Sequence, residues 1–461
     1  MTKYDIVVIG GGPSGMVTAM TAKKEYGDKS VLMIKESPLG VVPCGIPYVF
    51  HLLGNVDKNR MGPKAFVDMG GKVLLGHVET VDTEARTLKM ASGEEVGYDK
   101  LVFATGSRPT VPTFIPGHDK PEGVGYVPKT YEGIQALKEQ ADAANQIIVL
   151  GSGFTAVELA EQLAREADKE VHLVYRAEHC LLRAFSKPVA LRVDEAVTEA
   201  GVIRHSRSQI AKITGGPDRA TGIQLADGRE MAADMVVIAM GYSPNSELAD
   251  EAGVKVNGHG GISVDNYMRT SAPDVFAVGD CAASQEFITG RPARIMLAST
   301  AAAEARILGY NLYSMRIKRK FAGTLSVFST ELSRQAFASA GVMESDARAD
   351  GIDIVVGEFE DVDRHPASLP GVSRVGARLV VSPGDGQIIG GELYGGKSVG
   401  AMVNTLALAI QKNVTVYELI SFQLGTHPLL TTAPTKPILV KAAEKAITQM
   451  HADAGARAAA S

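Results

Sequence analysis

Tyr4-Asp5-Ile6-Val7-Val8-Ile9-Gly10-Gly11-Gly12-Pro13-Ser14-Gly15 is the stretch that decides the fold of the N-terminal region. Its apolar run predicts a buried strand, and the pattern from Ser14 to about Lys24 predicts a helix. The glycine spacing between them is that of a dinucleotide-binding loop. Gly10 permits the tight turn, Gly12 lets a pyrophosphate approach the backbone, and Gly15 lets helix and strand pack closely. The helix N-terminus, at Pro13 and Ser14, then offers N–H groups to the phosphate.

A second strand is expected over Ser30 to Ile34, which completes a βαβ unit. It is followed by Lys35 and Glu36. An acidic residue about twenty positions after the loop accepts a hydrogen bond from a ribose 2′-OH, so Glu36 is the candidate for that role. The alternative is a solvated charge at a strand end.

The pattern returns once, from residue 146 onward. A strand over Ile147 to Leu150 precedes a second loop and a helix expected over Thr155 to Ala167. The loop offers four candidate cofactor contacts: Gly151, Gly153, Phe154 and Thr155. The following strand, Val171 to Tyr175, ends in Tyr175-Arg176 instead of an acid, and Arg183 lies close behind. Arginine here favours the 2′-phosphate of NADPH over NADH. The alternative is two ordinary surface arginines.

The three cysteines are Cys44, Cys180 and Cys281, an odd and widely spaced set that argues against a secreted disulfide framework. Pro47 predicts a helix that begins near Cys44. The dipole of this helix would stabilise a thiolate at Cys44. The alternative for Cys44 is a small buried apolar residue. Cys180 lies in a predicted loop and is expected to be incidental, and Cys281 is expected to be a packing residue.

Length and charge exclude several classes of protein. A chain of 461 residues predicts about three domains, and a net charge of −5 argues against nucleic acid or anionic membrane as a partner. No apolar run is long enough to span a bilayer and no signal-peptide layout is present, so a cytoplasmic location is expected.

Strand-like runs after Gly323, followed by a helix over Val399 to Lys412, predict a separate α+β domain. Ala452 to Ser461 is expected to be a frayed tail.

Taken together, these motifs resemble the pyridine nucleotide-disulfide oxidoreductase family, and most closely its single-cysteine branch. That branch includes coenzyme A-disulfide reductases, NADH oxidases and peroxidases, and persulfide or polysulfide reductases. The resemblance rests on five motifs in the family's order: Gly10 to Gly15, Cys44 to Tyr48, Ala104 to Pro109, Gly151 to Glu158, and Thr270 with Val275 to Cys281.

The resemblance implies an α/β fold with two Rossmann-like domains and a C-terminal α+β dimerisation domain. The nicotinamide domain would be inserted in the FAD domain. The expected boundaries are residues 1–115 and 246–322 for FAD, 116–245 for NAD(P), 323–450 for dimerisation and 451–461 for a flexible tail.

The resemblance also implies site roles. Asp280 would bind the FAD ribityl and phosphate region, Cys44 would lie beside the flavin, and Glu158 would lie at the nicotinamide end of the second site. Taken alone, Asp280 is also compatible with an N-cap of a helix over Ala282 to Glu286, and Glu158 with a first-turn acid. The remaining candidate cofactor contacts are Thr105, Gly106, Arg108, Gly241 and Gly279.

Two departures from the family pattern concern the substrate. The stretch from His365 to Pro370 lacks the tyrosine typical of coenzyme A-disulfide reductases. His427-Pro428 is similar to the His-Pro of two-cysteine reductases, but Thr432 replaces the orienting glutamate. His427 is a candidate acid/base, and the alternative is a surface or interface histidine without a chemical role.

The expected function is therefore reduction of a disulfide, persulfide or polysulfide by NAD(P)H and FAD through Cys44, in a homodimer. No metal site is expected. One alternative is an NAD(P)H oxidase or peroxidase that cycles Cys44 through sulfenic acid. A second is a redox-sensing flavoprotein with little turnover.

Overall fold

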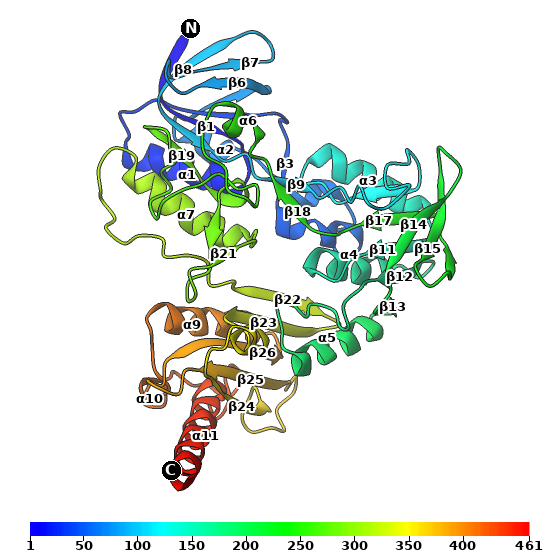
Figure 1. Cartoon of the computed structure of the whole chain (residues 1–461), viewed down its shortest axis with the longest axis vertical. Coiled ribbons are helices and arrows are strands. Elements are labelled where there is room, and N and C mark those ends of the chain that lie inside the picture. Colours follow the sequence, from blue (N-terminus) through cyan, green and yellow to red (C-terminus); the bar gives the residue numbers. More distant parts are fainter. Residues whose placement is uncertain (461) are drawn as a thin grey trace. The chain divides into compact units, whose positions relative to one another are not determined.

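The computed structural model describes residues 1–460, with side chains described through Ala456 (Figure 1). Its first sheet is built on β1 (Thr2–Ile9), which pairs in parallel with β2 (Val31–Lys35) and β8 (Glu95–Phe103). The strand order is β5-β2-β1-β8-β7-β6, and β19 (Val275–Ala277) joins β8. The outer strands are β5 (Lys72–Leu75), β6 (Val78–Asp82) and β7 (Thr87–Met90).

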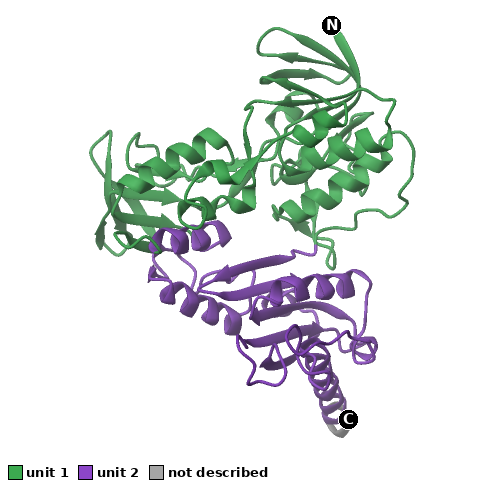
Figure 2. Cartoon of the chain, turned by 180° about the vertical axis from the view of Figure 1, so that it is seen from behind, with its two compact units in different colours: residues 1–151, 165–172, 209–324 green, residues 152–164, 173–208, 325–461 purple. Residues whose placement is uncertain are grey.

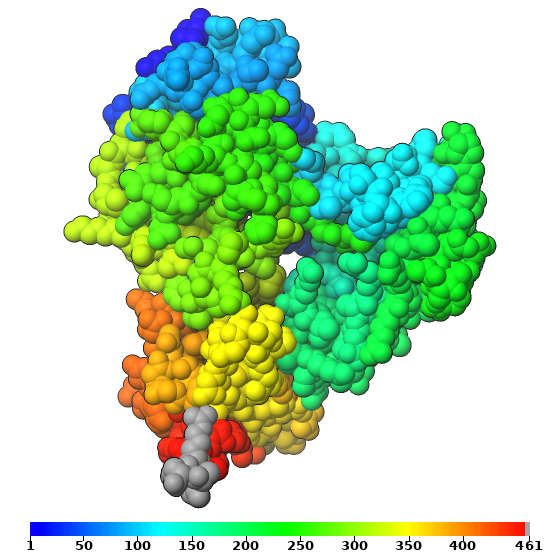
Figure 3. Space-filling model, in the orientation of Figure 1, coloured from blue at the N-terminus to red at the C-terminus, as the bar shows by residue number. Residues whose placement is uncertain are grey.

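Successive residues of the apolar run in β1 point to opposite faces of the sheet, so both faces are buried. Ile6, Val8 and Val102 pack beneath α1 (Pro13–Glu25) and α7 (Ala298–Asn311). Val7, Leu101 and Phe103 lie in the core on the opposite face. That core brings β6 together with α6 (Glu247–Glu251), and in Figure 3 the light-blue and green surfaces of these segments adjoin.

The pairing of β19 with β8 shows that a segment is inserted in this domain, because the two strands are adjacent in the sheet and far apart in the sequence. The connection at each end of the insertion is a short strand. These strands, β9 (Ser107–Pro109) and β18 (Tyr242–Pro244), pair antiparallel. The predicted insertion of one Rossmann-like domain in the other is confirmed.

The inserted segment contains a second parallel sheet, in which β10 (Val124–Tyr126), β17 (Met235–Ile238) and β11 (Gln146–Leu150) are neighbours in that order. The other elements are α3 (Tyr131–Ala143), α4 (Phe154–Ala164), β12 (Glu170–Val174), α5 (Lys187–Glu199) and β13 (Ile203–His205). A small antiparallel sheet is formed by β14 (Ile210–Gly215), β15 (Ala220–Leu225) and β16 (Glu230–Ala232).

The C-terminal region is a five-stranded antiparallel sheet in the order β22-β23-β26-β25-β24. Its strands are β22 (Phe328–Leu332), β23 (Gln335–Gly341), β24 (Val355–Val362), β25 (Arg374–Val381) and β26 (Ile388–Gly395). Helix α9 (Val399–Gln411) packs on β23 and β26, and α11 (Ile438–Ala460) packs on β24 and β25. The shorter helices are α8 (Glu344–Ala349) and α10 (Val416–Leu419).

The short elements that remain lie mostly in loops. They are the strands β3 (Gly40–Val41), β4 (Arg60–Met61), β20 (Ser284–Gln285) and β21 (Pro292–Ala293), helix α2 (Lys64–Asp68), and the 3₁₀ turns η1 (Pro43–Gly45), η2 (Pro47–Phe50), η3 (Val56–Asn59) and η4 (Gly279–Cys281). No helix in the described part of the chain has the length and apolar character needed to cross a membrane.

The chain divides into two compact units (Figure 2). The first comprises residues 1–151, 165–172 and 209–324, and the second comprises residues 152–164, 173–208 and 325–461. Helices α4 and α5 therefore group with the C-terminal sheet, because both pack against β22. This division cuts through the domain predicted over 116–245.

Three local expectations differ from the structure. The segment around Cys44 forms two 3₁₀ turns, η1 and η2, instead of a helix, and Ala282 to Glu286 contains the short strand β20. The segment predicted as a tail continues α11 as far as Ala460, because its alanines favour helix. Ser461 lies outside the described residues.

Candidate active site

The first glycine loop has the geometry that a pyrophosphate requires. A side chain at Gly10 would lie 2.1 Å from the Ala104 oxygen, and one at Gly15 would lie 2.0 Å from the Gly10 oxygen, so both glycines are needed for close packing. Gly12 instead faces open space, since nothing lies within 4 Å of an added Cβ. Gly12 is the N-cap of α1 and no side chain caps this helix. The free N–H groups and the positive dipole end of α1 fit a bound pyrophosphate, a group that FAD contains.

The distal motif at Gly279 and Asp280 meets this loop because β19 and β1 flank β8. A Cβ at Gly279, which has a φ of +76°, would lie 2.5 Å from the Ser14 hydroxyl. The Asp280 carboxylate accepts hydrogen bonds of 2.7 Å from both the Ser107 hydroxyl and the Lys129 ammonium group. The alternative for Asp280, an N-cap of a helix over Ala282 to Glu286, is wrong, because that stretch contains the strand β20.

A buried acid, Glu304 on α7, lies behind Gly279. Its carboxylate accepts the Gly279 N–H at 2.8 Å, and the residue is only 3% exposed. Burial raises the pKa of Glu304 to about 8, and the nearby charge of Asp280 adds to the increase. The group is therefore largely protonated at neutral pH.

Two charged side chains end β2 beside the glycine loop. Lys35 is buried against Gly11, where an added Cβ would lie 3.0 Å from its Cδ atom. Glu36 is exposed and its carboxylate lies 2.6 Å from Nδ1 of His77. Glu36 thus keeps its carboxylate at the surface.

The connection around Thr105 and Gly106 joins the two ends of the inserted segment. Asn245 donates from its side-chain amide to the Thr105 oxygen at 2.9 Å, and its N–H bonds the Gly106 oxygen. Arg108 forms a bidentate ion pair with Glu247, whose pKa it lowers. Glu247 therefore occupies the guanidinium group of Arg108. Gly241 has a φ of +104° and open space around it, and its oxygen bonds Thr110 N–H.

Cys44 lies in the 3₁₀ turn η1 and is exposed. One turn has only a small dipole, so the predicted stabilisation of a thiolate by a following helix does not apply. Asn59, which is 5% exposed, holds the turn instead. Its backbone oxygen accepts Val42 N–H at 3.0 Å, and its side-chain amide donates to the Val42 oxygen at 3.1 Å. A Cβ at Gly45 would lie 2.0 Å from the Asn59 amide oxygen.

The other two cysteines are fully buried. Burial raises the pKa of Cys180 to about 12, despite a hydrogen bond from Tyr175 that lowers it. Burial likewise raises the pKa of Cys281, whose thiol lies 3.4 Å from the Val278 oxygen. Both thiols are therefore shielded from solvent.

The second glycine loop is followed by aromatic packing. Gly153 is exposed and an added Cβ would meet nothing within 4 Å, so the start of α4 is open to a ligand next to Thr155. Phe154 stacks on Phe328 at 4.9 Å between ring centroids and contacts Phe185 edge-on. The Phe154 ring therefore packs within the second unit. Gly151, with a φ of +139°, permits the turn after β11.

The loop from Tyr175 to Ser186 presents the arginines. Tyr175 is 4% exposed and its hydroxyl accepts a hydrogen bond from Arg204, so its side chain faces inward. Arg176 and Arg183 are exposed, and neither forms an ion pair among the described residues. By contrast, the neighbouring Arg204 pairs with Asp194 at 2.8 Å.

Glu158 lies on α4, and its carboxylate accepts a hydrogen bond of 2.7 Å from the Thr330 hydroxyl on β22. Burial raises the pKa of Glu158 to about 7, although the bond from Thr330 lowers it. A group with this pKa changes its charge near neutral pH.

His427 lies in an exposed segment of the second unit. Its Nδ1 accepts Leu429 N–H at 3.2 Å, which leaves Nε2 as the proton-bearing nitrogen of the neutral ring. The stretch that begins at His365 meets the same segment, since His365 N–H bonds the Pro428 oxygen at 3.2 Å and Nδ1 lies 3.1 Å from the Thr431 oxygen. The structure thus joins the two places where the sequence departs from the family pattern.

Sequence reasoning missed four residues that shape these sites: Asn59, Ser107, Lys129 and Glu304. Asn59, Lys129 and Glu304 belong to no recognisable motif. Ser107 lies within the motif from Ala104 to Pro109, which is the signal that could have identified it.

Comparison with known proteins identifies the family. The family model for pyridine nucleotide-disulphide oxidoreductases matches residues 4–305, and the model for that family's dimerisation domain matches residues 327–438. An NADH oxidase of Enterococcus faecalis is 29% identical over 423 residues, which cover 90% of this chain and 93% of that protein.

Two solved structures are also similar. An NAD-dependent persulfide reductase from A. fulgidus is 29% identical with a TM-score of 0.88, and the match covers 96% of this chain and 83% of that one. An engineered water-forming NADPH oxidase bound to NADPH is 27% identical with a TM-score of 0.87, covering 98% and 100%. It derives from the NADH oxidase of Lactobacillus brevis by substitutions that remove one aspartate and introduce two arginines.

These matches cover both the Rossmann-like region and the C-terminal sheet, so the expected fold class and the expected cofactors are confirmed. The open cradle at Gly12 agrees with a bound FAD. The chain is an oxidoreductase of the pyridine nucleotide-disulphide oxidoreductase family, which uses FAD and NAD(P)H.

Proposed function

We propose that the protein reduces a sulfur–sulfur bond, in a disulfide, persulfide or polysulfide, with electrons from NAD(P)H and with Cys44 as the redox-active thiol. The observation that carries this proposal is the contrast among the cysteines. Cys44 is exposed, whereas Cys180 and Cys281 are buried and have raised pKa values. Only Cys44 can meet an acceptor from solution, and only a thiol that reaches thiolate form attacks sulfur.

The reaction balances in two steps. The Cys44 thiolate attacks one sulfur of the acceptor, forming a mixed disulfide and releasing the other sulfur as thiolate or hydrosulfide. The mixed disulfide then takes up two electrons and two protons, which NAD(P)H and one solvent proton supply, and yields the Cys44 thiol and a second reduced sulfur product. FAD, when bound, relays this electron pair. Asn59 holds the turn so that the Cys44 side chain stays at the surface.

A homodimer completes the proposed site. The exposed segment around His427 carries several large apolar side chains, which a second subunit would cover: Ile420, Phe422, Leu424, Leu429 and Leu430. In the proposed dimer, His427 of one subunit serves Cys44 of the other, with Nε2–H as the donor to the leaving sulfur.

The preferred reductant in this proposal is NADPH. Arg176 and Arg183 are exposed and have no carboxylate partner among the described residues, and Glu178 between them is neutralised by Lys187 and Arg207. Two available guanidinium groups bind a 2′-phosphate well. The arginines introduced in the engineered NADPH oxidase support the same assignment.

A second candidate function is an NAD(P)H oxidase that cycles Cys44 through sulfenic acid. Its support is the NADH oxidase of Enterococcus faecalis, which matches along 90% of this chain. Oxygen uptake without a sulfur acceptor distinguishes the two functions: turnover in air as fast as turnover with polysulfide would displace the reductase.

The test compares wild-type protein with Cys44→Ser and with two matched controls, Cys180→Ser and Cys281→Ser. Under anaerobic conditions we expect Cys44→Ser to lower polysulfide reduction on the order of a thousandfold, and the controls to keep the wild-type rate. Reductive titration with NADPH should also show a long-wavelength absorbance band that Cys44→Ser lacks. Equal spectra and equal turnover in all four proteins would refute the cysteine mechanism.

A further inference from the structure

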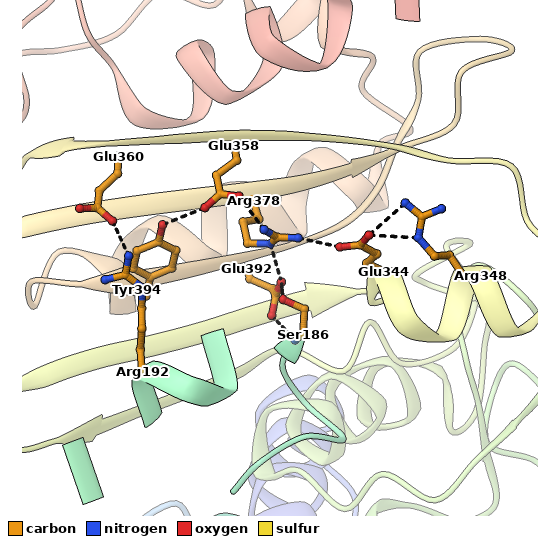
Figure 4. A network of polar contacts seen from close by, with 9 residues as sticks. All are labelled: Ser186, Arg192, Glu344, Arg348, Glu358, Glu360, Arg378, Glu392 and Tyr394. Atoms are coloured by element: carbon orange, nitrogen blue, oxygen red, sulfur yellow. Dashed lines mark hydrogen bonds and ion pairs between the residues drawn. The ribbon is translucent and has the colours of Figure 1, made fainter. Parts of the chain in front are cut away.

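A row of charged side chains crosses the C-terminal sheet (Figure 4). Glu358, Arg378 and Glu392 are register neighbours on β24, β25 and β26. Arg378 is 8% exposed and lies 2.6 Å from Glu358, 2.6 Å from Glu344 on α8 and 3.4 Å from Glu392. The guanidinium group thus has three carboxylate partners.

Glu392 extends from this row to the start of α5. It is 1% exposed, and its carboxylate accepts both the N–H and the hydroxyl of Ser186, the latter at 2.6 Å. Ser186 is the N-cap of α5, but its own side chain makes no capping bond. A buried carboxylate without such partners is costly, so the contact between Glu392 and Ser186 is a strong one.

Ser186 is also the last residue of the loop that carries the two arginines. The loop is attached at two earlier points. Leu181 N–H bonds the Ser152 oxygen of the second glycine loop at 2.9 Å, and Cys180 N–H bonds Asp194 at 3.0 Å. Arg183 lies between the attachments at Leu181 and Ser186, so its backbone is held from both sides.

We propose that Glu392 is a positioning residue for the reductant: by holding Ser186 it fixes Arg183 for contact with the 2′-phosphate of NADPH. This inference rests on the proposed NADPH preference. It assigns part of the nucleotide specificity to a side chain of the C-terminal sheet that does not touch the nucleotide. Arg176 lies before the attachments at Cys180 and Leu181, so it does not depend on Glu392.

The experiment measures nucleotide binding by calorimetry on the FAD-loaded protein, with adenosine 2′,5′-bisphosphate and 5′-AMP as probes. We expect Glu392→Gln to weaken binding of the bisphosphate about tenfold, as for one charge-assisted contact, and to leave 5′-AMP unchanged. Glu344→Gln is the matched control, because it removes another carboxylate from Arg378 and leaves Ser186 untouched. It should bind both probes as wild type does.

A double-mutant cycle separates positioning from general damage. In an Arg183→Ala background Glu392→Gln should have no further effect, whereas in Arg176→Ala the two effects should add. If Glu392→Gln does not fold, Ser186→Ala, which keeps the backbone N–H, should give a smaller loss for the bisphosphate alone.

Three results would overturn this role of Glu392: unchanged binding of the bisphosphate, equal weakening of both probes, or equal effects of Glu392→Gln and Glu344→Gln. A wild-type protein that binds both probes equally would overturn the NADPH preference itself, and Glu392 with it. That failure is visible before any variant is made.

Discussion

Glu304 is the buried acid behind Gly279, and replacing it with glutamine should stabilise the protein in a pH-dependent way. The variant keeps an amide oxygen that can accept the Gly279 N–H, which is the bond seen at 2.8 Å. It loses the ability to ionise. Because the residue is 3% exposed, the ionised form has almost no water to solvate it.

The size of the effect follows from the pKa. In the native state the pKa of Glu304 is about 8, raised by burial from an ordinary value of 4.5. Between these values the native state binds more protons than the unfolded state, so stability falls as the pH rises, by about 1.4 kcal/mol per pH unit. The cost is absent below pH 4.5 and reaches about 5 kcal/mol above pH 8. Glu304→Gln removes it.

Thermal unfolding of the FAD-loaded protein at several pH values measures this cost. With about 2 °C per kcal/mol for a unit of this size, the variant should melt about 10 °C above wild type at pH 8.5 and about 1 °C above it at pH 5. Glu79→Gln, which makes the same change at an exposed ion pair with Lys89, should show no such trend. A difference between Glu304→Gln and wild type that stays constant with pH would refute the reasoning.

Three further predictions concern the sites. Gly12→Ala should weaken FAD binding by at least about a hundredfold, because its methyl group displaces charge-assisted hydrogen bonds to the pyrophosphate, worth about 1.5–3 kcal/mol each. Gly15→Ala should instead disrupt the loop itself. Calorimetric titration of the apoproteins with FAD measures both effects, and normal FAD binding by Gly12→Ala would contradict the prediction. Asn59→Ala should slow polysulfide reduction about tenfold without loss of flavin, as one buried hydrogen bond is lost; an unchanged rate would show that the turn holds itself. Glu158→Gln should remove an inflection near pH 7 from the rate of NAD(P)H oxidation, and an inflection that persists would assign it to another group.

The βαβ units were predictable because local signals agree there. An apolar run, a glycine loop and a helical pattern occur in order, and the helix expected from Ser14 to Lys24 is found over Pro13–Glu25. The conformation of the Cys44 segment was not predictable in this way, because Pro43 and Pro47 each begin a separate short turn. Asn59, which holds the first turn, is brought there by the pairing of β3 with β4.

Contacts between distant parts of the chain have no sequence signature. Lys129 reaches Asp280 only because the insertion returns to the first sheet through β18 and β19. Glu392 likewise reads as an ordinary polar residue of a strand, and Ser186 as an ordinary N-cap. Their contact depends on how α5 packs on the C-terminal sheet, which periodicity does not encode.

The burial of two of the three cysteines has a practical consequence. Since Cys44 is the exposed thiol of the chain, a maleimide dye or a spin label added to the native enzyme should react with one equivalent per subunit, without removal of any other cysteine. The same reagent then counts the subunits in a preparation that have a reactive Cys44. Competition between the label and a sulfur acceptor measures how much of the Cys44 site the acceptor occupies.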